Sequence, residues 1–378
     1  MLLLKNGHVI DPCNQIDQAA DVLVKDGVIV QVGQVKEQAD NVIDAAGCYV
    51  TPGLIDHHCH LSPLAKIGLP AEAVCFASGV TTAVDAGSTG CAAYPEHRPF
   101  IQGSKLRIKA YLNVCTTGLS SLPVLEDVDP AHWDEGAIRA CFDRYGDELL
   151  GLKLRTSAPI VKELGYAPLR AAVDMAERLG VTVMVHCTNP PGEMGRLLER
   201  LRPGDVMTHM YMNQGSTIVE SGAVKDCVLR ARERGVVFEA ADARAHFGLD
   251  VAQTAIGAGF WPDILDSDLT KLSMHLRPTA FNMAMQLSKY KALGIPFSTL
   301  IGLCTQAPAA HMGMLDAIGS LTAGHSADVA VFRPLHRENV FGDRPYGDEE
   351  QQRMRGETVY EPVLTLKDGD MVYRSVTF

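Results

Sequence analysis

Short apolar strands separated by turn signals occupy the first fifty residues of the chain, with an Asp-Gly turn at 26–27. The last sixty residues return to the same pattern, with a second Asp-Gly turn at 368–369. Each end is too short to bury a core of its own. We therefore expect the two ends to pair into one small β-sandwich-like module, built from residues 1–50 and 320–378.

Between the two ends, apolar strands alternate with amphipathic helical segments, a pattern typical of βα units around a parallel sheet. The helical segments 168–180 and 222–235 each end in a glycine, as helices commonly do. The predicted strands are eight, at 53–60, 80–87, 107–114, 149–156, 181–188, 205–212, 236–243 and 263–270. Eight βα units predict an α/β protein with a (β/α)8 (TIM) barrel over residues 51–319, in which chemistry takes place at the C-terminal ends of the strands.

Composition narrows the class of protein. The net charge of −11, without a clustered Lys/Arg stripe, argues against nucleic acid as a partner. The chain shows no signal peptide at its start and no apolar run of the ~20 residues that cross a bilayer. Its ten cysteines include no C-x-x-C pair, which favours free thiols in a reducing compartment. We expect a cytoplasmic protein with a small-molecule substrate and no membrane partner, and we leave homo-oligomerisation open.

Unusual polar residues close several of the predicted barrel strands. The strand ends carry His58, His60, Lys153, Arg155, His186, His209 and Asp268. Residues two apart on a strand share a face, so His58 and His60 can hold one ion while Cys59 faces the helices. Imidazoles with a carboxylate suit zinc and its neighbours. A single strand-end histidine is more often structural, but this set reaches one rim from five strands and therefore indicates a metal centre.

Lys153 is the unexpected member of this set, because an ammonium group beside divalent cations is repelled and costly to bury. The segment GLIDHHCH, the lone Lys after strand four, the single His after strands five and six, and the Asp after strand eight together resemble the amidohydrolase superfamily of the two-metal type. The stretches GLKLRTS, RERGVVFEAADARAHF and FWPDILDSDL are similar to its dihydroorotase-like and deacetylase subgroup. The resemblance covers nearly the whole chain.

This resemblance implies two divalent metal ions, for which we favour Zn²⁺. By residue, it implies that His58, His60 and Asp268 hold the more buried metal and that His186 and His209 hold the more exposed one. Lys153 would be N-carboxylated by CO2 and bridge both metals. A bridging water or hydroxide would be the nucleophile, and Asp268 would be the catalytic residue that takes its proton and passes it to the leaving group.

Two further residues are candidates for binding substrate. Arg155 shares the face of Lys153, where its guanidinium could clamp a substrate carboxylate, the alternative being a structural ion pair. His246, after strand seven, could contact substrate, although loop histidines are usually solvated. Family members often carry a His-Gly pair just after strand seven, and this chain has Ala241-Asp242 instead, which puts substrate contacts there in doubt.

Other candidates have simpler explanations. By its place next to His58, His57 should face outward. Strand alternation turns Cys187 away from the rim, and His275 is a loop residue that could reach the mouth. The GSTG segment at 87–90 lacks the Lys and helix of a phosphate loop. The remaining histidines lie on segments without a partner ligand, namely His8, His97, His132, His311, His325 and His336.

The sequence thus predicts a metal-dependent hydrolase that cleaves a non-peptide C–N amide bond, or a related ester, in a small acyl substrate bearing a carboxylate. A cyclic amide hydrolase of the dihydroorotase or hydantoinase type is the first alternative. Dihydroorotases usually carry an Arg directly after the H-x-H pair, whereas residues 61–63 here are Leu-Ser-Pro. A deaminase of the adenine deaminase type comes next, although its mononuclear site dispenses with the Lys. A non-catalytic barrel is the last alternative, and such barrels lose ligands.

Overall fold

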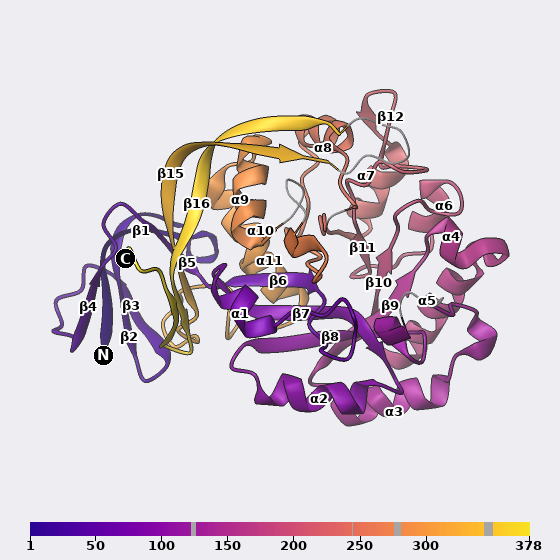
Figure 1. Cartoon of the computed structure of the whole chain (residues 1–378), viewed down its shortest axis with the longest axis horizontal. Helices are drawn as coiled ribbons and strands as arrows, with labels where there is room; N and C mark the ends of the chain where they lie inside the picture. The colour runs from indigo at the N-terminus through magenta and orange to yellow at the C-terminus, as the bar shows by residue number, and fades with distance from the viewer. Residues whose placement is uncertain (122–125, 244, 276–280, 344–350) are drawn as a thin grey trace.

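Two large sheets lie side by side in the computed structural model, which describes residues 1–121, 126–243, 245–275, 281–343 and 351–378 (Figure 1). The first sheet takes strands from both chain ends, and both termini lie beside it. Its strands are β1 (Leu2–Asp11), β2 (Ile16–Lys25), β3 (Val28–Gly33), β4 (Asn41–Asp44), β5 (Tyr49–Pro52), β15 (Val329–Gly342), β16 (Arg353–Lys367) and β17 (Asp370–Arg374).

The two predicted Asp-Gly turns join antiparallel strands in this sheet. Asp26 and Gly27 have φ of 50° and 80° between β2 and β3, and Asp368 and Gly369 have φ of 50° and 78° between β16 and β17. Positive φ at both positions is the hairpin turn that matches strand twist, which is why Asp-Gly occurs there. The shared sheet agrees with the expected pairing of the ends, while the domain limits at 50 and 320 stay a prediction.

The second sheet is parallel, runs in chain order, and forms the wall of the predicted barrel. Its strands are β6 (Leu54–Cys59), β7 (Val80–Gly90), β8 (Arg107–Asn113), β9 (Leu149–Arg155), β10 (Thr182–His186), β11 (Val206–Thr208) and β14 (Val237–Phe238). The eighth predicted strand, 263–270, is not a regular strand. It instead makes isolated parallel bridges to both edges of the sheet, Glu239 to Ile264 and Cys59 to Leu269, and so completes the barrel.

Two predicted strands are shorter than expected and the eighth is irregular, and all three segments adopt left-handed backbone conformations toward their C-terminal ends. His209 directly follows β11 with φ of 61°, Ala241 and Ala243 follow β14 with φ of 46° and 44°, and Asp268 has φ of 48°. Side chains with a Cβ rarely adopt such angles, and strained residues of this kind gather at functional sites. The Asp56 carboxylate also accepts hydrogen bonds from the backbone N–H and the hydroxyl of Ser267, which takes the place of a regular ladder in the eighth segment.

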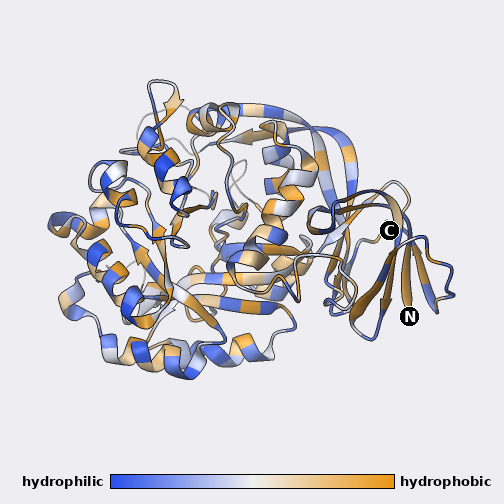
Figure 2. Cartoon of the chain, turned by 180° about the vertical axis from the view of Figure 1, so that it is seen from behind, coloured by the Kyte–Doolittle hydropathy of each residue, from blue (hydrophilic) through white to orange (hydrophobic). Residues whose placement is uncertain are grey.

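Helices cover the outside of the barrel, and Figure 2 shows apolar strands inside with hydrophilic residues on the outer faces of the helices. The helix predicted at 168–180 is α5, ending at Gly180 with φ of 70°. The helix predicted at 222–235 begins later, because Gly222 turns a small hairpin first. The helices are α1 (Ala71–Phe76), α2 (Tyr94–Gly103), α3 (Glu135–Tyr145), α4 (Ala158–Val161), α5 (Ala167–Leu179), α6 (Met194–Leu198), α7 (Asp226–Glu233), α8 (Leu249–Gly257), α9 (Met283–Ala292), α10 (Phe297–Cys304) and α11 (Gln306–His311), and the hairpin is β12 (Val219–Glu220) with β13 (Ala223–Val224).

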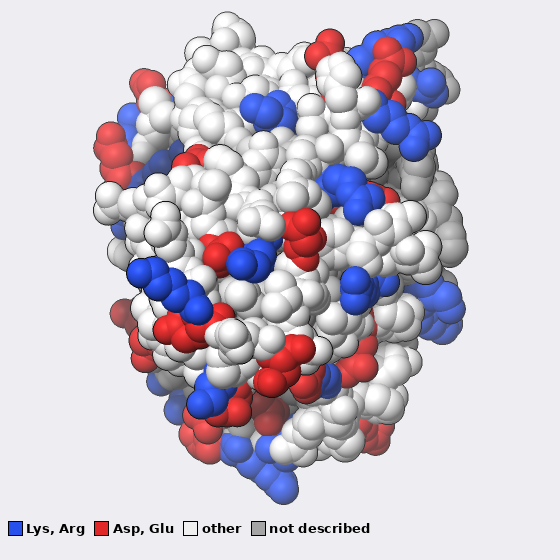
Figure 3. Space-filling view, turned by 90° about the vertical axis from the view of Figure 1, so that its left-hand side faces the viewer, with Lys and Arg blue, Asp and Glu red and all other residues white. Residues whose placement is uncertain are grey.

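The long strands β15 and β16 connect the two parts of the molecule, reaching from the first sheet along α9 toward α8 (Figure 1). On the face shown in Figure 3, acidic and basic side chains are interspersed, without a field of one sign. Across the described ranges, no helix has the length and apolar character needed to cross a bilayer. All ten cysteines are free thiols, as predicted.

Candidate metal centre

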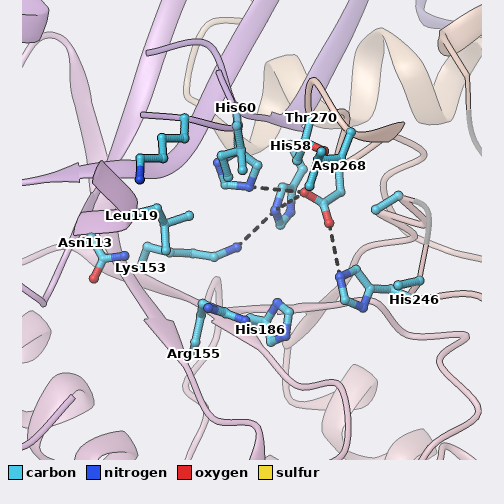
Figure 4. A pocket seen from close by; sticks show the side chains of 15 residues that line it. His58, His60, Asn113, Leu119, Lys153, Arg155, His186, His246, Asp268 and Thr270 are labelled. Carbon is cyan, nitrogen blue, oxygen red and sulfur yellow. Dashed lines mark hydrogen bonds and ion pairs between the residues drawn. The ribbon is translucent and has the colours of Figure 1, made fainter. Parts of the chain in front are cut away.

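A cavity of about 410 Å³ opens at the C-terminal ends of the barrel strands, and the predicted site residues line it (Figure 4). Its polar lining includes His58, His60, Lys153, Arg155, His186, His246 and Asp268. The fully buried His209 lies against this group, with its ring 4.2 Å from that of His246. Ile67, Leu119 and Leu272 form apolar walls. The structure therefore brings together all eight residues predicted from the sequence.

Asp268 lies at the centre of the first group of donors. Its Oδ1 is 3.2 Å from Nε2 of His60 and 3.6 Å from Nε2 of His58. One ligand atom each of His58, His209 and Asp268 lies within 4.8 Å of the other two. The carboxylate and these imidazoles thus converge on one point, as ligands of a shared cation do.

A second group of donors adjoins the first. Nε2 of His209 lies 2.8 Å from Nδ1 of His186. One nitrogen each of His186, His209 and His246 also lies within 4.8 Å of the other two. His209 belongs to both groups and connects them.

The outward ring nitrogens of the histidines are held by hydrogen bonds. Nδ1 of His58 bonds to Glu239, Nδ1 of His60 to the Ser88 hydroxyl, and Nδ1 of His209 to the carbonyl of Ala241, at 2.8, 2.9 and 2.6 Å. Because Glu239 and the Ala241 carbonyl can only accept, Nδ1 of His58 and of His209 carries the proton, and Nε2 of each neutral ring faces the site with its lone pair. Such support is the usual companion of a metal-binding histidine.

Lys153 is fully buried, and its Nζ lies 3.1 Å from Nε2 of His58. Burial lowers the pKa of this amine to about 8, against the opposing effects of Glu239 and Asp268. Gly87, with φ of 79°, lets the lysine stem pass, because a Cβ at that position would lie 2.5 Å from Cβ of Lys153. The first glycine of the GSTG segment, Gly87, therefore makes room for the side chain of Lys153. The segment itself is the C-terminal end of β7.

Arg155 forms an ion pair at the edge of the cavity, and its role in binding substrate stays a prediction. It lines the cavity, and its Nη1 lies 3.0 Å from the buried carboxylate of Glu126, which also accepts a hydrogen bond from Asn113.

Cys59 packs in the hydrophobic core, as expected for a residue that faces the helices. Cys187 does so too, and burial raises the pKa of its thiol to about 12, which disfavours the reactive thiolate. The side chain of His275 lies outside the described residues.

Glu239 is a functional candidate that the sequence reasoning missed. It is fully buried beneath the site, and its two oxygens accept hydrogen bonds from Nδ1 of His57 at 2.7 Å and from Nδ1 of His58 at 2.8 Å. The signal that could have found it is a carboxylate placed directly between apolar residues of a strand, in the stretch VVFEAA. Such a residue is rarely buried unless it is paired.

The prediction that His57 faces outward was wrong, although His57 does not line the cavity itself. The pairing of β6 with β7 shifts register between Asp56 and Cys59, so the strict alternation of side chains fails there. His57 is fully buried, and its Nε2 lies 3.2 Å from Nδ1 of His311. His311, which we expected to have no partner, is therefore part of a buried polar chain that also includes His57 and Glu239 and reaches His58.

Glu239→Gln is expected to weaken metal binding by about 10- to 100-fold, because the loss of a partner that orients a metal-binding histidine typically has this effect. Zinc affinity measured by competition with a chromophoric chelator tests this expectation. Glu126→Gln is the matched control, since Glu126 is an equally buried carboxylate that contacts Arg155 rather than a predicted ligand. Unchanged zinc affinity in Glu239→Gln would show that Glu239 serves only to pack His57.

The donor set fits divalent metal ions. Burial, followed by the neighbouring histidines, holds the pKa of His186 and His209 well below the usual range, so both rings are neutral and can act as ligands. Together with the Asp268 carboxylate, they offer the nitrogen and oxygen donors that zinc and similar ions prefer.

A (β/α)8 barrel with such a donor set at its C-terminal rim defines the class of metal-dependent barrel hydrolases. Comparison with known families gives the particular family: the model of the Amidohydrolase family matches residues 49–369, and the chain belongs to this family. The predicted resemblance and fold class are confirmed. The protein is accordingly a metal-dependent hydrolase that acts on C–N bonds.

Individual relatives agree with this assignment. A deacetylase of Agrobacterium fabrum is 33% identical over 323 residues, which span 83% of this chain and 78% of the relative. A crystal structure described as a dihydroorotase superposes with a TM-score of 0.88 at 28% identity, covering 99% of this chain and 100% of that one. A structure described as an adenine deaminase has a TM-score of 0.89 at 24% identity, covers 99% of both chains, and shows the shared fold alone.

Proposed function

We propose that this protein removes an acyl group from the nitrogen of a small substrate that bears a carboxylate, in the manner of a deacetylase or aminoacylase, with related esters as further substrates. The similarity to a deacetylase over 83% of the chain carries the proposal. The cavity supports it, because Arg155 and the metal donors line the same space and the apolar walls leave room for an acyl chain. Lys66, which the sequence reasoning did not consider, adds a second cationic group to the lining.

We further propose that two zinc ions would be held by His58, His60, His186, His209 and Asp268, and that Lys153 would be carboxylated and supply an anionic oxygen ligand. Bound divalent cations would lower the pKa of a water molecule to about 7 and polarise the substrate carbonyl. Among the residues of the chain, Arg155 orients the substrate carboxylate. Asp268 takes a proton from the attacking water and delivers it to the leaving nitrogen as the C–N bond breaks. The products are a carboxylic acid and an amine.

A cyclic amide hydrolase remains the second candidate, favoured by the superposition with the structure described as a dihydroorotase. The two positions directly after the H-x-H pair have a structural role here. The backbone N–H groups of Leu61 and Ser62 donate to Oδ2 of Asp85 at 2.8 and 3.0 Å, which ties this loop to β7. Neither residue offers a cation to a substrate carboxylate.

A hydrolysis screen on zinc-loaded protein in bicarbonate buffer tests the proposed function. We expect turnover of N-acyl amino acids, weaker turnover of the matching acyloxy acids, and little or none of dihydroorotate, hydantoins and adenine. Preference for a cyclic amide would replace the proposal by the second candidate. The absence of turnover in all of these groups would contradict the acyl-hydrolase assignment.

The same screen examines the role of Arg155. In Arg155→Gln, KM should rise by about 10- to 100-fold for N-acyl amino acids and little for their neutral amides, because a charge-assisted hydrogen bond contributes about 1.5–3 kcal/mol. Glu126→Gln is the control, since it removes the partner of Arg155 and keeps the guanidinium.

A further inference from the structure

His246 extends the second group of donors beyond the ligands that the family resemblance implies. Its ring centre lies 4.2 Å from that of His209 and 4.9 Å from that of His186. The candidate ligand nitrogens of the three rings lie within 4.8 Å of one another. Two nitrogens bound to one zinc ion, each at about 2.0–2.1 Å, lie at most ~4.2 Å apart, so modest side-chain rotations would bring all three into one coordination sphere.

The orientation of the His246 ring matches that of a ligand. Its Nδ1 lies 2.8 Å from the hydroxyl of Thr188, and its Nε2 lies 3.6 Å from Oδ2 of Asp268, on the side of the other donors (Figure 4). His58, His60 and His209 share this arrangement, with Nδ1 engaged away from the site. The arrangement presents Nε2 to whatever lies among the donors.

The turn that carries His246 is anchored from below. The buried carboxylate of Asp242 pairs with Lys289 at 2.5 Å and accepts hydrogen bonds from Tyr290 and Gln286, all three on α9. The backbone N–H of His246 in turn donates to the carbonyl of Asp242 at 3.0 Å. The Ala241-Asp242 departure from the family pattern thus provides an anchor for the turn and places an imidazole over His209.

We propose that His246 is a third imidazole ligand of the second metal, beside His186 and His209, rather than a substrate contact. This inference rests on the two-metal site of the proposed function, but not on the identity of the acyl substrate. Three imidazoles hold a borderline cation such as zinc or cobalt more firmly than two. They also favour these ions over manganese, which prefers oxygen ligands.

Metal retention tests the proposal without any substrate. Wild-type protein and His246→Ala are loaded with zinc, dialysed against graded concentrations of a chelator, and assayed for zinc per chain. We expect the wild type to lose its two ions in separate steps, and His246→Ala to lose the weaker ion at a chelator concentration at least about tenfold lower. The tighter ion should dissociate as in the wild type. Cobalt-loaded protein provides a second readout, because the absorption of the second site should change when a nitrogen ligand is lost.

Two further variants separate ligation from loss of structure. Thr188→Val removes the partner of Nδ1 while keeping the imidazole, and we expect a smaller loss of zinc affinity than in His246→Ala. His132→Ala is the matched control, because this exposed histidine pairs with Asp127 away from the site, and both ions should be retained. The melting temperature of each metal-free variant establishes that the fold is kept.

The outcomes are distinct. Unchanged zinc and cobalt binding in His246→Ala, with KM raised for an identified substrate, would overturn the proposal and make His246 a substrate contact. A wild-type protein that binds a single ion would overturn both this proposal and the two-metal site. Failure of every acyl substrate, with two ions bound and the weaker one dependent on His246, would contradict the proposed substrate class and leave the ligand assignment supported.

Discussion

Replacement of Asp268 by Asn is expected to lower kcat by at least about 10³-fold, which is within the contribution of a positioned general acid or base. The carboxylate is 5% exposed and lies 3.2 Å from His60 and 3.6 Å from His58, so it belongs to the donor set as well as to the cavity wall. Asn keeps the shape of the side chain, and the left-handed φ of 48° at this position suits Asn as well as Asp. The loss should therefore come from the charge and not from the fold.

Steady-state kinetics with the best substrate of the screen, together with zinc content per chain, provide the measurement. If the variant keeps its zinc and kcat falls, the role of Asp268 is proton transfer. If the variant loses zinc, the role of Asp268 is mainly to bind the metal. Asp127→Asn is the control, because this carboxylate is exposed and pairs with His132 on the surface. A variant at Asp268 that keeps more than about a tenth of wild-type turnover would contradict the catalytic role of this carboxylate.

The site residues could be predicted from the sequence because parallel strands end at one rim. Each of His58, Lys153 and His186 lies at the C-terminal end of an apolar strand, so their approach to one another requires only that the strands form one sheet. The same reasoning could not predict that the last segment, 263–270, lacks a regular strand. The strained backbone at Asp268 and the hydrogen bonds from Ser267 to Asp56 depend on contacts between residues about two hundred positions apart.

The faces of buried strands were harder to predict than their positions. Both faces of a barrel strand are covered, so the hydrophobic pattern does not show which way a polar residue points. His57 was misplaced for this reason, because a register shift against β7 turns it toward Glu239. Similarly, the role of Asp242 in anchoring the turn that carries His246 depends on its ion pair with Lys289. Lys289 is distant in the sequence and adjacent in space, so the sequence pattern does not reveal this contact.

Replacement of Lys153 by Ala should lower turnover by about 10³-fold, because the metal centre contributes several kcal/mol to transition-state stabilisation. In its unmodified form this amine is buried 3.1 Å from Nε2 of His58, and an ammonium there would repel any cation held by the same histidine. Carboxylation exchanges that positive charge for an anionic oxygen ligand. Acetate or propionate added to Lys153→Ala should therefore enter the vacated space and restore part of the zinc binding and the activity.

Removal of carbon dioxide tests the carboxylation of Lys153 in the wild-type protein. Metal-free protein reconstituted with zinc in degassed buffer should recover little activity, and labelled bicarbonate should restore it together with a carbamate signal in the carbon NMR spectrum. Lys66→Met is the matched control, since Lys66 lines the same cavity but is exposed, and its variant should still require bicarbonate and bind zinc as the wild type does. Full activity with two zinc ions bound and a plain amine at Lys153 would contradict the proposed role of a carboxylated Lys153, because both cations would then be held without it.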